Sequence, residues 1–512
     1  MRKLLLIFSL LFFLSSCVRK QTLPPRRIAP RRRVRVFTWP ITVRVKIHEF
    51  RRHLKFHVEG DVYINGESLL PDGNYSVKLK RVKASTFNYY EILMKSSSFR
   101  KANEFYKSLE RGSTGKKIFF VDVGTIYKFG SITVDNRKFY VLRGPYNGKK
   151  ARYRMYVEPV TPPHATLILF NDYGEKIKEF QDSLSLTTDN GMVNIGTYEI
   201  SGGRIIITVD TKGRGTVIFE TDIEDYIKRV LPAEMPMNFP VEALKAQSVV
   251  ARTFALSNLG KFYRYQPYDF TSTVTSQVFQ GKKYELADSV VNLTRGIVLF
   301  YGDRLAQVYY HSTCGGHTED VTCIWGGEEI PYLKGVKDGN FNLNLRDPVE
   351  VRIFIYSPPQ QLLCNLTDNA AILPYVERNF RWKVVLARKK VEKLVKKYTG
   401  KGIGKLLSIT PIKRGVSGRI TEIVISGTKR SVKIVGEYKI RKVFGGLKSS
   451  LFVIDYLRDD NGNVVNVIFN GGGAGHGVGM CQVGAGILAD KGFKMKDIIK
   501  HYFPGVKGVK LY

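Results

Sequence analysis

Acidic side chains are scarce in this chain of 512 residues. Asp and Glu number 45 against 81 Lys and Arg, which gives a formal net charge of +36 and a pI near 9.8. A balance so basic implies anionic surroundings: nucleic acid, anionic lipid headgroups or acidic polymers of the cell envelope. Apolar residues are not scarce, because 43% of the chain is hydrophobic and 12% is aromatic. Real cores can therefore form, and wholesale disorder is excluded.

The hydrophobic run at the N-terminus is too short to cross a bilayer comfortably. Two basic residues precede an apolar stretch from Leu4 to Leu14, and small residues lead to Cys17, which is typical of a secretory signal. Residues 14–17 resemble the bacterial lipobox, in which cleavage leaves a lipidated cysteine. We expect residues 1–17 to be a lipoprotein signal peptide, with a plain signal peptide as the alternative. The expected location is then an exported, membrane-anchored lipoprotein of the bacterial cell envelope, and export removes nucleic acid as a partner.

Cysteine is rare as well, with five residues in the whole chain. If Cys17 carries the lipid, an even number remains in an exported protein, so disulfides are allowed. Cys364 has no partner in the sequence pattern and is most simply a buried thiol.

The chain divides into segments by composition. Residues 18–40 are rich in Arg and Pro and are expected to be a solvated tether from the membrane. From Ile41 the apolar residues alternate, and β-like segments continue to residue 195, with one helix expected over 98–110. Nothing in 41–195 carries a chemical motif, so we interpret it as a β-rich accessory domain. The chemical motifs lie in residues 196–512.

Glu234 lies between Pro232 and Pro236, which fix φ and disfavour helix in the residues before them. The sequence predicts a short helix over 222–231 with a Thr221/Glu224 capping box, and then Glu234 on a stiff loop outside any helix. A carboxylate placed in this way is suited to general acid catalysis. The alternative is a loop Glu that only caps or is solvated.

The next helix is expected from Pro240 to Leu259. Leu244, Ser248, Ala251 and Ala255 form a stripe of small residues on it, which lets another element approach closely. Gln247 and Arg252 lie off the stripe, as surface polar groups or as partners in core hydrogen bonds.

Four candidate metal ligands follow within thirteen residues: His311, Cys314, His317 and Cys323. Two imidazoles and two thiolates suit tetrahedral Zn²⁺, and a filled shell leaves no open position for a catalytic water. The spacing is not that of a standard zinc finger. A Cys314–Cys323 disulfide is the alternative.

Five short motifs stand between residues 224 and 482. They are Glu-Asp-Tyr (224–226), Pro-Ala-Glu-Met (232–235), Leu-Lys-Ala-Gln with Ala-Arg-Thr (244–253), Ser-Gln-Val-Phe-Gln-Gly (276–281) and Gly-His-Gly-Val-Gly-Met-Cys-Gln (475–482). Together they resemble the stage II sporulation protein D and amidase-enhancer family of peptidoglycan lytic transglycosylases. The chain departs from the family pattern at Phe279, where the family has Tyr, and at Cys481, where it has Ser.

The resemblance implies an α+β fold, in which a catalytic region (196–512) with mixed strands and a central helix follows the β-rich accessory region. It implies that Glu234 is the catalytic residue, and that Phe279 and Gln277 offer a ring face and an amide to a sugar. The residues expected to bind substrate or organise the site are Gln247, Arg252, Ser276, Gln277, His476 and Gln482. It also implies that zinc is a structural ion and that no organic cofactor is needed.

The implied reaction cleaves the bond between N-acetylmuramic acid and N-acetylglucosamine in glycan strands stripped of peptides. Ordinary glycosidases need two carboxylates, whereas a transglycosylase needs one, because the sugar's 6-hydroxyl attacks C1 and leaves a 1,6-anhydro end. Glu234 would first donate and then accept a proton, which favours a raised pKa. The expected partners are glycan strands, a cell-wall amidase that strips the peptides, and the membrane through the lipid anchor.

Three other interpretations stay open. The first is a non-catalytic peptidoglycan-binding amidase enhancer, in which Glu234 is dispensable. The second is a zinc hydrolase that uses His311, His317 and a bound water. The third is an inverting hydrolase that produces reducing ends.

Overall fold

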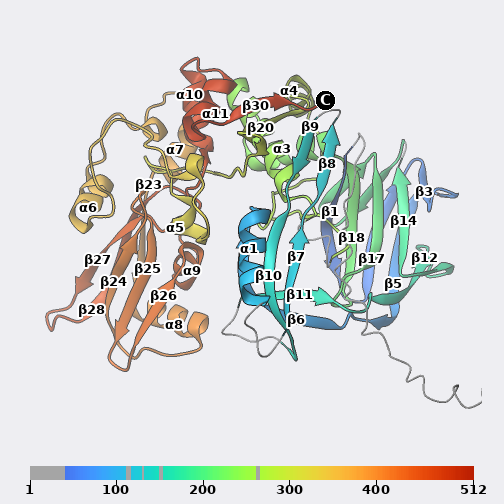
Figure 1. The fold of residues 1–512 in the computed structure, drawn as a ribbon, viewed down its shortest axis with the longest axis horizontal. Helices are drawn as coiled ribbons and strands as arrows, with labels where there is room; N and C mark the ends of the chain where they lie inside the picture. The colour runs from blue at the N-terminus through green and yellow to red at the C-terminus, as the bar shows by residue number, and fades with distance from the viewer. Residues whose placement is uncertain (1–40, 111–116, 130–131, 149–153, 189, 261–265) are drawn as a thin grey trace, which may run out of the picture. The chain divides into compact units, whose positions relative to one another are not determined.

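The structure is a computed structural model that describes residues 41–512 except 111–116, 130–131, 149–153, 189 and 261–265. The expected signal peptide with Cys17 and the tether at 18–40 lie outside the described residues. No described helix is long and apolar enough to span a membrane. The described chain combines helices with many small sheets, which confirms the α+β class (Figure 1).

The first described strand, β1 (Thr42–Phe50), belongs to a seven-stranded sheet (Figure 1). Its alternating Val43, Val45 and Ile47 are buried, which confirms the predicted strand. β1 pairs with β18, so this sheet joins residues on both sides of the boundary expected at residue 195, and that boundary stays a prediction. In spatial order the strands are β19 (Phe270–Thr271), β1, β18 (Gly215–Asp222), β17 (Arg204–Val209), β14 (Ser183–Thr188), β3 (Val62–Ile64) and β4 (Ser68–Leu70).

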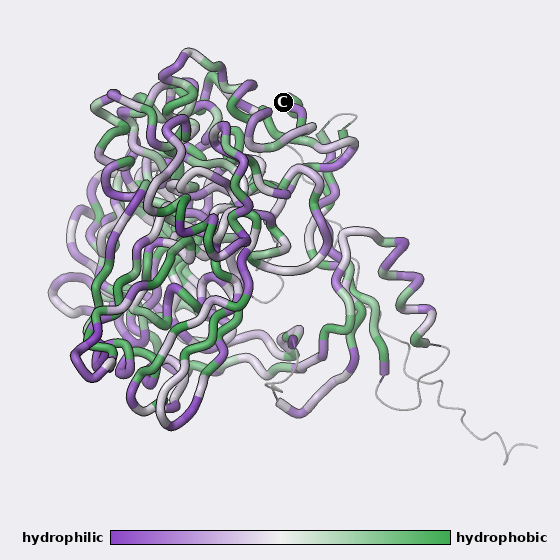
Figure 2. The backbone as a smooth tube through the Cα atoms, turned by 90° about the vertical axis from the view of Figure 1, so that its left-hand side faces the viewer, coloured by the Kyte–Doolittle hydropathy of each residue, from purple (hydrophilic) through white to green (hydrophobic). Residues whose placement is uncertain are grey.

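Two more sheets and a hairpin complete the β-rich part. In β2 (His53–Glu59) and β5 (Gly73–Lys83) of one sheet buried and more exposed residues alternate, as in sheets with one buried face. Figure 2 shows hydrophobic and hydrophilic residues interspersed along the described chain. The helix expected at 98–110 is α1 (Phe99–Glu110), whose Phe99 contacts the rings of Phe120 and Phe139. One sheet has the order β13 (Lys176–Gln181), β12 (His164–Phe170), β5 (Gly73–Lys83), β2 (His53–Glu59), β15 (Met192–Ile195), β16 (Tyr198–Ser201). The other has the order β11 (Met155–Pro159), β6 (Phe87–Ser96), β10 (Lys138–Tyr146), β7 (Ile118–Val123), and the hairpin is β8 (Ile126–Phe129) with β9 (Ile132–Asp135).

Helix α2 (Ile223–Glu234) corrects two predictions. Its N-cap is Asp222, whose carboxylate accepts from the amides of Glu224 and Asp225, so Thr221 and Glu224 do not form the expected capping box. Pro232 lies inside the last turn, and Glu234 is the final helical residue instead of a loop residue. A proline this close to the end of a helix removes few backbone hydrogen bonds. Burial of Val230 and Leu231 stabilises the helical turn that contains Pro232.

Helix α3 (Val241–Asn258) confirms the predicted central helix. All four residues of the small stripe are buried, and the rest of the helix is also apolar or buried on most sides, as expected for a core helix. It packs against α2 and against α4 (Glu285–Leu293), β20 (Ile297–Tyr301), α10 (Gln482–Asp490) and α11 (Met495–Tyr502). β20 also pairs with β21 (Arg304–Leu305) and β30 (Lys507–Lys510).

The C-terminal part holds a second hydrophobic core, around Trp382, Phe452 and Phe469. It lies between two three-stranded sheets and two helices. One sheet is β23 (Arg381–Ala387), β28 (Val464–Gly472), β27 (Phe452–Arg458), and the other is β24 (Leu406–Arg414), β25 (Ile420–Gly427), β26 (Ser431–Val435). The helices are α8 (Arg388–Thr399) and α9 (Glu437–Val443). The connecting segments contain β22 (Tyr310–His311), α5 (Val321–Trp325), η1 (Pro331–Leu333), α6 (Pro348–Tyr356), η2 (Leu363–Asn365), α7 (Leu373–Asn379) and β29 (Met480–Cys481).

Candidate active site

Glu234 ends α2 just before α3, and its carboxylate is held by two donors. The amide N–H of Val278 donates to Oε1 at 2.5 Å, and the Tyr310 hydroxyl makes a second hydrogen bond to the side chain. Burial raises the pKa of the carboxyl above its usual 4.5, and the two hydrogen bonds offset part of that rise. A carboxyl that stays protonated to higher pH than usual is suited to general acid catalysis.

Gln277 positions the tyrosine that faces Glu234. Its Nε2 donates to the Tyr310 hydroxyl at 3.1 Å, and its Oε1 accepts from the Tyr226 hydroxyl at 3.1 Å. Burial raises the pKa of both tyrosines well above 10, and the Glu234 charge adds to the shift, so both hydroxyls are neutral donors. Sequence spacing gives no signal for Tyr310, because its partners lie far from it in the chain.

The residues on either side of Gln277 form contacts within the protein core and its turns. Ser276 lies in the turn, where its Oγ accepts from the amide of Thr271 at 3.2 Å. Phe279 is only 3% exposed and stacks on Tyr226 with 5.9 Å between ring centroids. The expected sugar-binding ring face of Phe279 is therefore wrong, because the ring is part of the core.

Gln482 joins the C-terminal glycine-rich motif to the end of α2. Its Nε2 donates to the backbone carbonyl of Glu234 at 2.9 Å and to Oε1 of Gln247 at 3.4 Å. The Gln247 side chain is buried, and its own Nε2 has no hydrogen-bond partner among the described residues. The glycines let the motif's backbone pack closely against the backbone just before β22. A Cβ on Gly479 would lie 2.1 Å from the carbonyl oxygen of Tyr309.

Arg252 lies in a buried ion pair. Its Nη2 contacts Glu224 Oε2 at 2.7 Å, and neither side chain is more than 3% exposed. Tyr512 donates a further hydrogen bond to Glu224. The pair holds α3 against the start of α2, so Arg252 supports the site from within the core.

His476 lies in an aromatic group with Trp325 and Tyr309, with centroid distances of 5.0 Å and 6.4 Å from its own ring. Its Nδ1 accepts from the amide of Val478, and burial lowers its pKa to about 3, so the ring is neutral. No described contact joins it to Glu234, and its expected place opposite Glu234 stays a prediction. Trp325 is 45% exposed and stands in none of the sequence motifs described above.

The four predicted zinc ligands are not brought together in the described chain. His311 Nδ1 pairs with the Val478 carbonyl at 3.2 Å, and His317 Nδ1 with the Thr318 carbonyl at 2.6 Å. Cys314 and Cys323 are both free thiols. The described residues contain one group of three metal-ligating side chains within 4.8 Å of one another, and Cys314 alone of the four belongs to it. Zinc on the predicted set of four stays a prediction.

Comparison with known proteins places these features in a family. The family model for the Stage II sporulation protein matches residues 211–301, which include α2, Glu234 and α3. A model for a Domain of unknown function (DUF8618) matches residues 319–479.

Curated relatives are similar to a larger part of the chain. An uncharacterized protein of Brachyspira hyodysenteriae is 29% identical over 71% of this chain and 88% of its own length. Stage II sporulation protein D of Bacillus amyloliquefaciens is 28% identical over 56% of this chain and 73% of its own length. The Amidase enhancer of Bacillus subtilis is 26% identical over 54% of this chain and 39% of its own length. Residues 211–301 therefore carry a stage II sporulation protein D domain, and the chain is similar to stage II sporulation protein D and amidase enhancer proteins at 26–28% identity over 54–56% of its length.

Proposed function

We propose that this protein acts on the cell wall as a peptidoglycan lytic transglycosylase, with Glu234 as general acid and then general base. The observation that carries the proposal is the environment of Glu234: a partly buried carboxyl with a raised pKa, held by Val278 N–H and the Tyr310 hydroxyl. Protonated, it donates to the glycosidic oxygen between N-acetylmuramic acid and N-acetylglucosamine. As carboxylate, it takes the proton of the 6-hydroxyl that attacks C1.

The immediate surroundings of Glu234 suit a mechanism with one carboxylate. After burial, the groups that shift its pKa are the Val278 amide and Tyr310, and no second carboxylate of the described chain is among them. Retaining and inverting hydrolases both need a second carboxylate near the first, as nucleophile or as base. The intramolecular attack of the 6-hydroxyl removes that need, and the product is a 1,6-anhydro end.

The neutral donors around Glu234 supply the remaining requirements. Tyr310 and the Val278 amide stabilise the carboxylate that forms after proton donation, so the same group can accept a proton in the second half of the reaction. Trp325, exposed beside Tyr309 and His476, offers a ring face to a sugar.

The test is mass spectrometry of peptide-stripped glycan strands incubated with the full chain, wild type beside Glu234→Gln. Anhydromuramic ends from the wild type alone support the proposal. Reducing ends would contradict the transglycosylase proposal and indicate a hydrolase.

The similarity to an Amidase enhancer favours one alternative, a peptidoglycan-binding protein that stimulates an amidase without cleaving glycan itself. That function predicts intact strands that sediment with both the wild type and Glu234→Gln. In this case the amidase would be the partner, and the lipid anchor expected at Cys17 would hold the complex at the envelope.

A further inference from the structure

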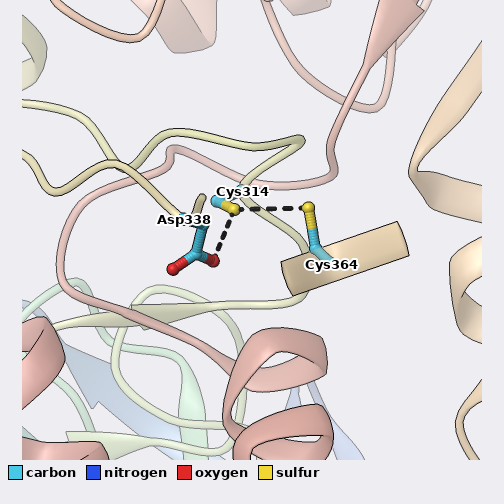
Figure 3. A group of neighbouring side chains, drawn as sticks. All are labelled: Cys314, Asp338 and Cys364. Atoms are coloured by element: carbon cyan, nitrogen blue, oxygen red, sulfur yellow. Dashed lines mark hydrogen bonds between the residues drawn. The ribbon is translucent and has the colours of Figure 1, made fainter. Parts of the chain in front are cut away.

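Cys314, Asp338 and Cys364 converge on one point inside the protein (Figure 3). Cys314 follows β22, Asp338 lies in the loop between η1 and α6, and Cys364 lies in η2. The Cys314 Sγ is 3.0 Å from Asp338 Oδ2 and 3.6 Å from the Cys364 Sγ, and all three residues are 0% exposed. Two buried thiols beside a buried carboxylate bring three side chains of the kinds that bind metals to one place.

A third thiol, that of Cys481, borders this group. Its Sγ accepts from the amide of Cys314 at 3.2 Å, and the two side chains also interact with each other. Cys481 is the N-cap of α10, where its Sγ also accepts from the amide of Gly484 at 3.3 Å. A Cβ on Gly484 would lie 2.8 Å from Asp338 Oδ2 and 3.4 Å from the Cys481 Sγ. Because Gly484 has no side chain, both atoms can lie next to its Cα.

The distances approach those of a tetrahedral zinc shell. With Zn–S near 2.3 Å and Zn–O near 2.0 Å, tetrahedral geometry puts neighbouring sulfurs about 3.8 Å apart and sulfur and oxygen about 3.5 Å apart. The Cys314–Cys364 separation of 3.6 Å is close to the first value, and the Cys314–Asp338 separation of 3.0 Å is shorter than the second. An ion that replaces the thiol proton would push the Cys314 sulfur and the carboxylate apart by a fraction of an ångström.

The surroundings fix the carboxylate and place two cationic side chains near the thiols. Asp338 Oδ1 contacts His501 Nε2 at 2.8 Å, and Tyr502 donates to Oδ2 at 3.0 Å, which orients the oxygen toward Cys314. Outer hydrogen bonds of this kind are typical of metal sites. The buried guanidiniums of Arg381 and Arg419 also interact with the charge of Cys314, and their positive charge offsets that of thiolates.

We propose that Cys314, Asp338 and Cys364, whose ligand atoms lie within 4.8 Å of one another, bind one Zn²⁺ in a structural site that Cys481 closes when its thiol turns toward the ion. Each ligating thiol gives its proton to solvent, so binding strengthens as pH rises. Because burial raises the pKa of the thiols in the absence of a cation, the ion must displace those protons. The site differs from the set predicted from sequence: it retains Cys314 and replaces His311, His317 and Cys323 by residues from three distant segments.

The first test measures metal in the full chain. Protein stripped by a chelator is loaded with Zn²⁺, freed of excess ion, and analysed for zinc per chain, with affinity from competition against a chromophoric chelator. The wild type should retain one equivalent. Cys364→Ser should weaken binding by at least about 100-fold, since losing even an outer partner costs about 10–100-fold. The matched control is Cys323→Ser, which removes a thiol outside the group and should bind as the wild type does.

Two measurements keep the test independent of how well a variant folds. Loading the wild type with Co²⁺ should produce a thiolate-to-cobalt charge-transfer band, and Zn²⁺ should raise its melting temperature until a chelator is added. The proposal is overturned by a wild type that retains no zinc, by cobalt without the thiolate band, or by loss of zinc in Cys323→Ser. A Cys314–Cys364 disulfide in the purified chain, detected by peptide mass spectrometry, would also overturn it.

Discussion

Gln482 donates a hydrogen bond from Nε2 to the backbone carbonyl of Glu234 at 2.9 Å, although 248 residues separate the two in sequence. The bond fixes the end of α2 against the start of α10. It therefore couples the position of the candidate catalytic carboxyl to the glycine-rich motif, whose close backbone packing allows α10 to reach Glu234.

Removing the Tyr310 hydroxyl tests a hydrogen-bond partner of the carboxyl. The hydroxyl lowers the pKa of Glu234, so Tyr310→Phe should raise that pKa further and shift the alkaline side of the pH–rate profile upward. It should also reduce kcat, because the carboxylate loses a donor when it forms. Tyr309→Phe is the matched control, since its ring contacts Trp325 and His476 and it has no described bond to Glu234. An unchanged profile in Tyr310→Phe would contradict this role.

The raised pKa of Glu234 also has a consequence for stability. The folded pKa lies above the unfolded value, so the contribution to stability is fully present below the unfolded pKa near 4.5 and is lost as pH rises through the folded value. The free energy of unfolding of the wild type should therefore fall relative to Glu234→Gln as pH rises above about 4.5. Urea titrations of both proteins at several pH values measure this difference. A difference that stays constant with pH, or that grows in favour of the wild type, would show that burial does not dominate at this carboxyl.

Much of this arrangement could be predicted from sequence, and its failures have physical causes. Local patterns identified β1, α3 and the residues around Glu234, because alternation and stripes of small residues reflect burial directly. Pro232 was a poor guide, since packing of α2 outweighs the local preference against helix. The partners of Cys364 and Tyr310 could not be predicted from spacing. Each contact joins segments far apart in the chain: 50 residues separate Cys364 from Cys314, and 33 separate Tyr310 from Gln277.

The buried pair of Glu224 and Arg252 should be important for folding. Arg252→Met leaves Glu224 with an uncompensated buried charge and should lower the free energy of unfolding by about 3–5 kcal/mol. Arg100→Ala breaks an exposed pair with Glu104 and should change it by less than about 1 kcal/mol. The double variant Glu224→Met/Arg252→Met should recover part of the loss, because it leaves no lone charge. Denaturant titrations measure these changes. If Arg252→Met and Arg100→Ala lower the free energy of unfolding by equally small amounts, the buried pair is not important for stability.

Trp325 is the candidate aromatic platform for the glycan. Trp325→Ala should raise KM about tenfold, which corresponds to ~1.4 kcal/mol of lost contact, with little change in kcat. Phe493→Ala removes an aromatic side chain of similar exposure, 47% against 45%. Steady-state kinetics on peptide-stripped strands measure the KM of both variants, and only Trp325→Ala should show the rise. If both variants keep the wild-type KM, Trp325 does not contact the substrate.

The central claim is that Glu234 directs an intramolecular attack instead of hydrolysis. The most direct test is digestion of stripped strands in ¹⁸O-labelled water by the wild type, by Glu234→Gln and by the control Glu242→Gln, whose carboxylate lies at the start of α3 and pairs with Lys245. We predict muramic ends that are one water lighter and carry no ¹⁸O, formed by the wild type and Glu242→Gln and absent with Glu234→Gln. Ends that carry ¹⁸O, or unlabelled anhydro ends formed by Glu234→Gln at the wild-type rate, would contradict it.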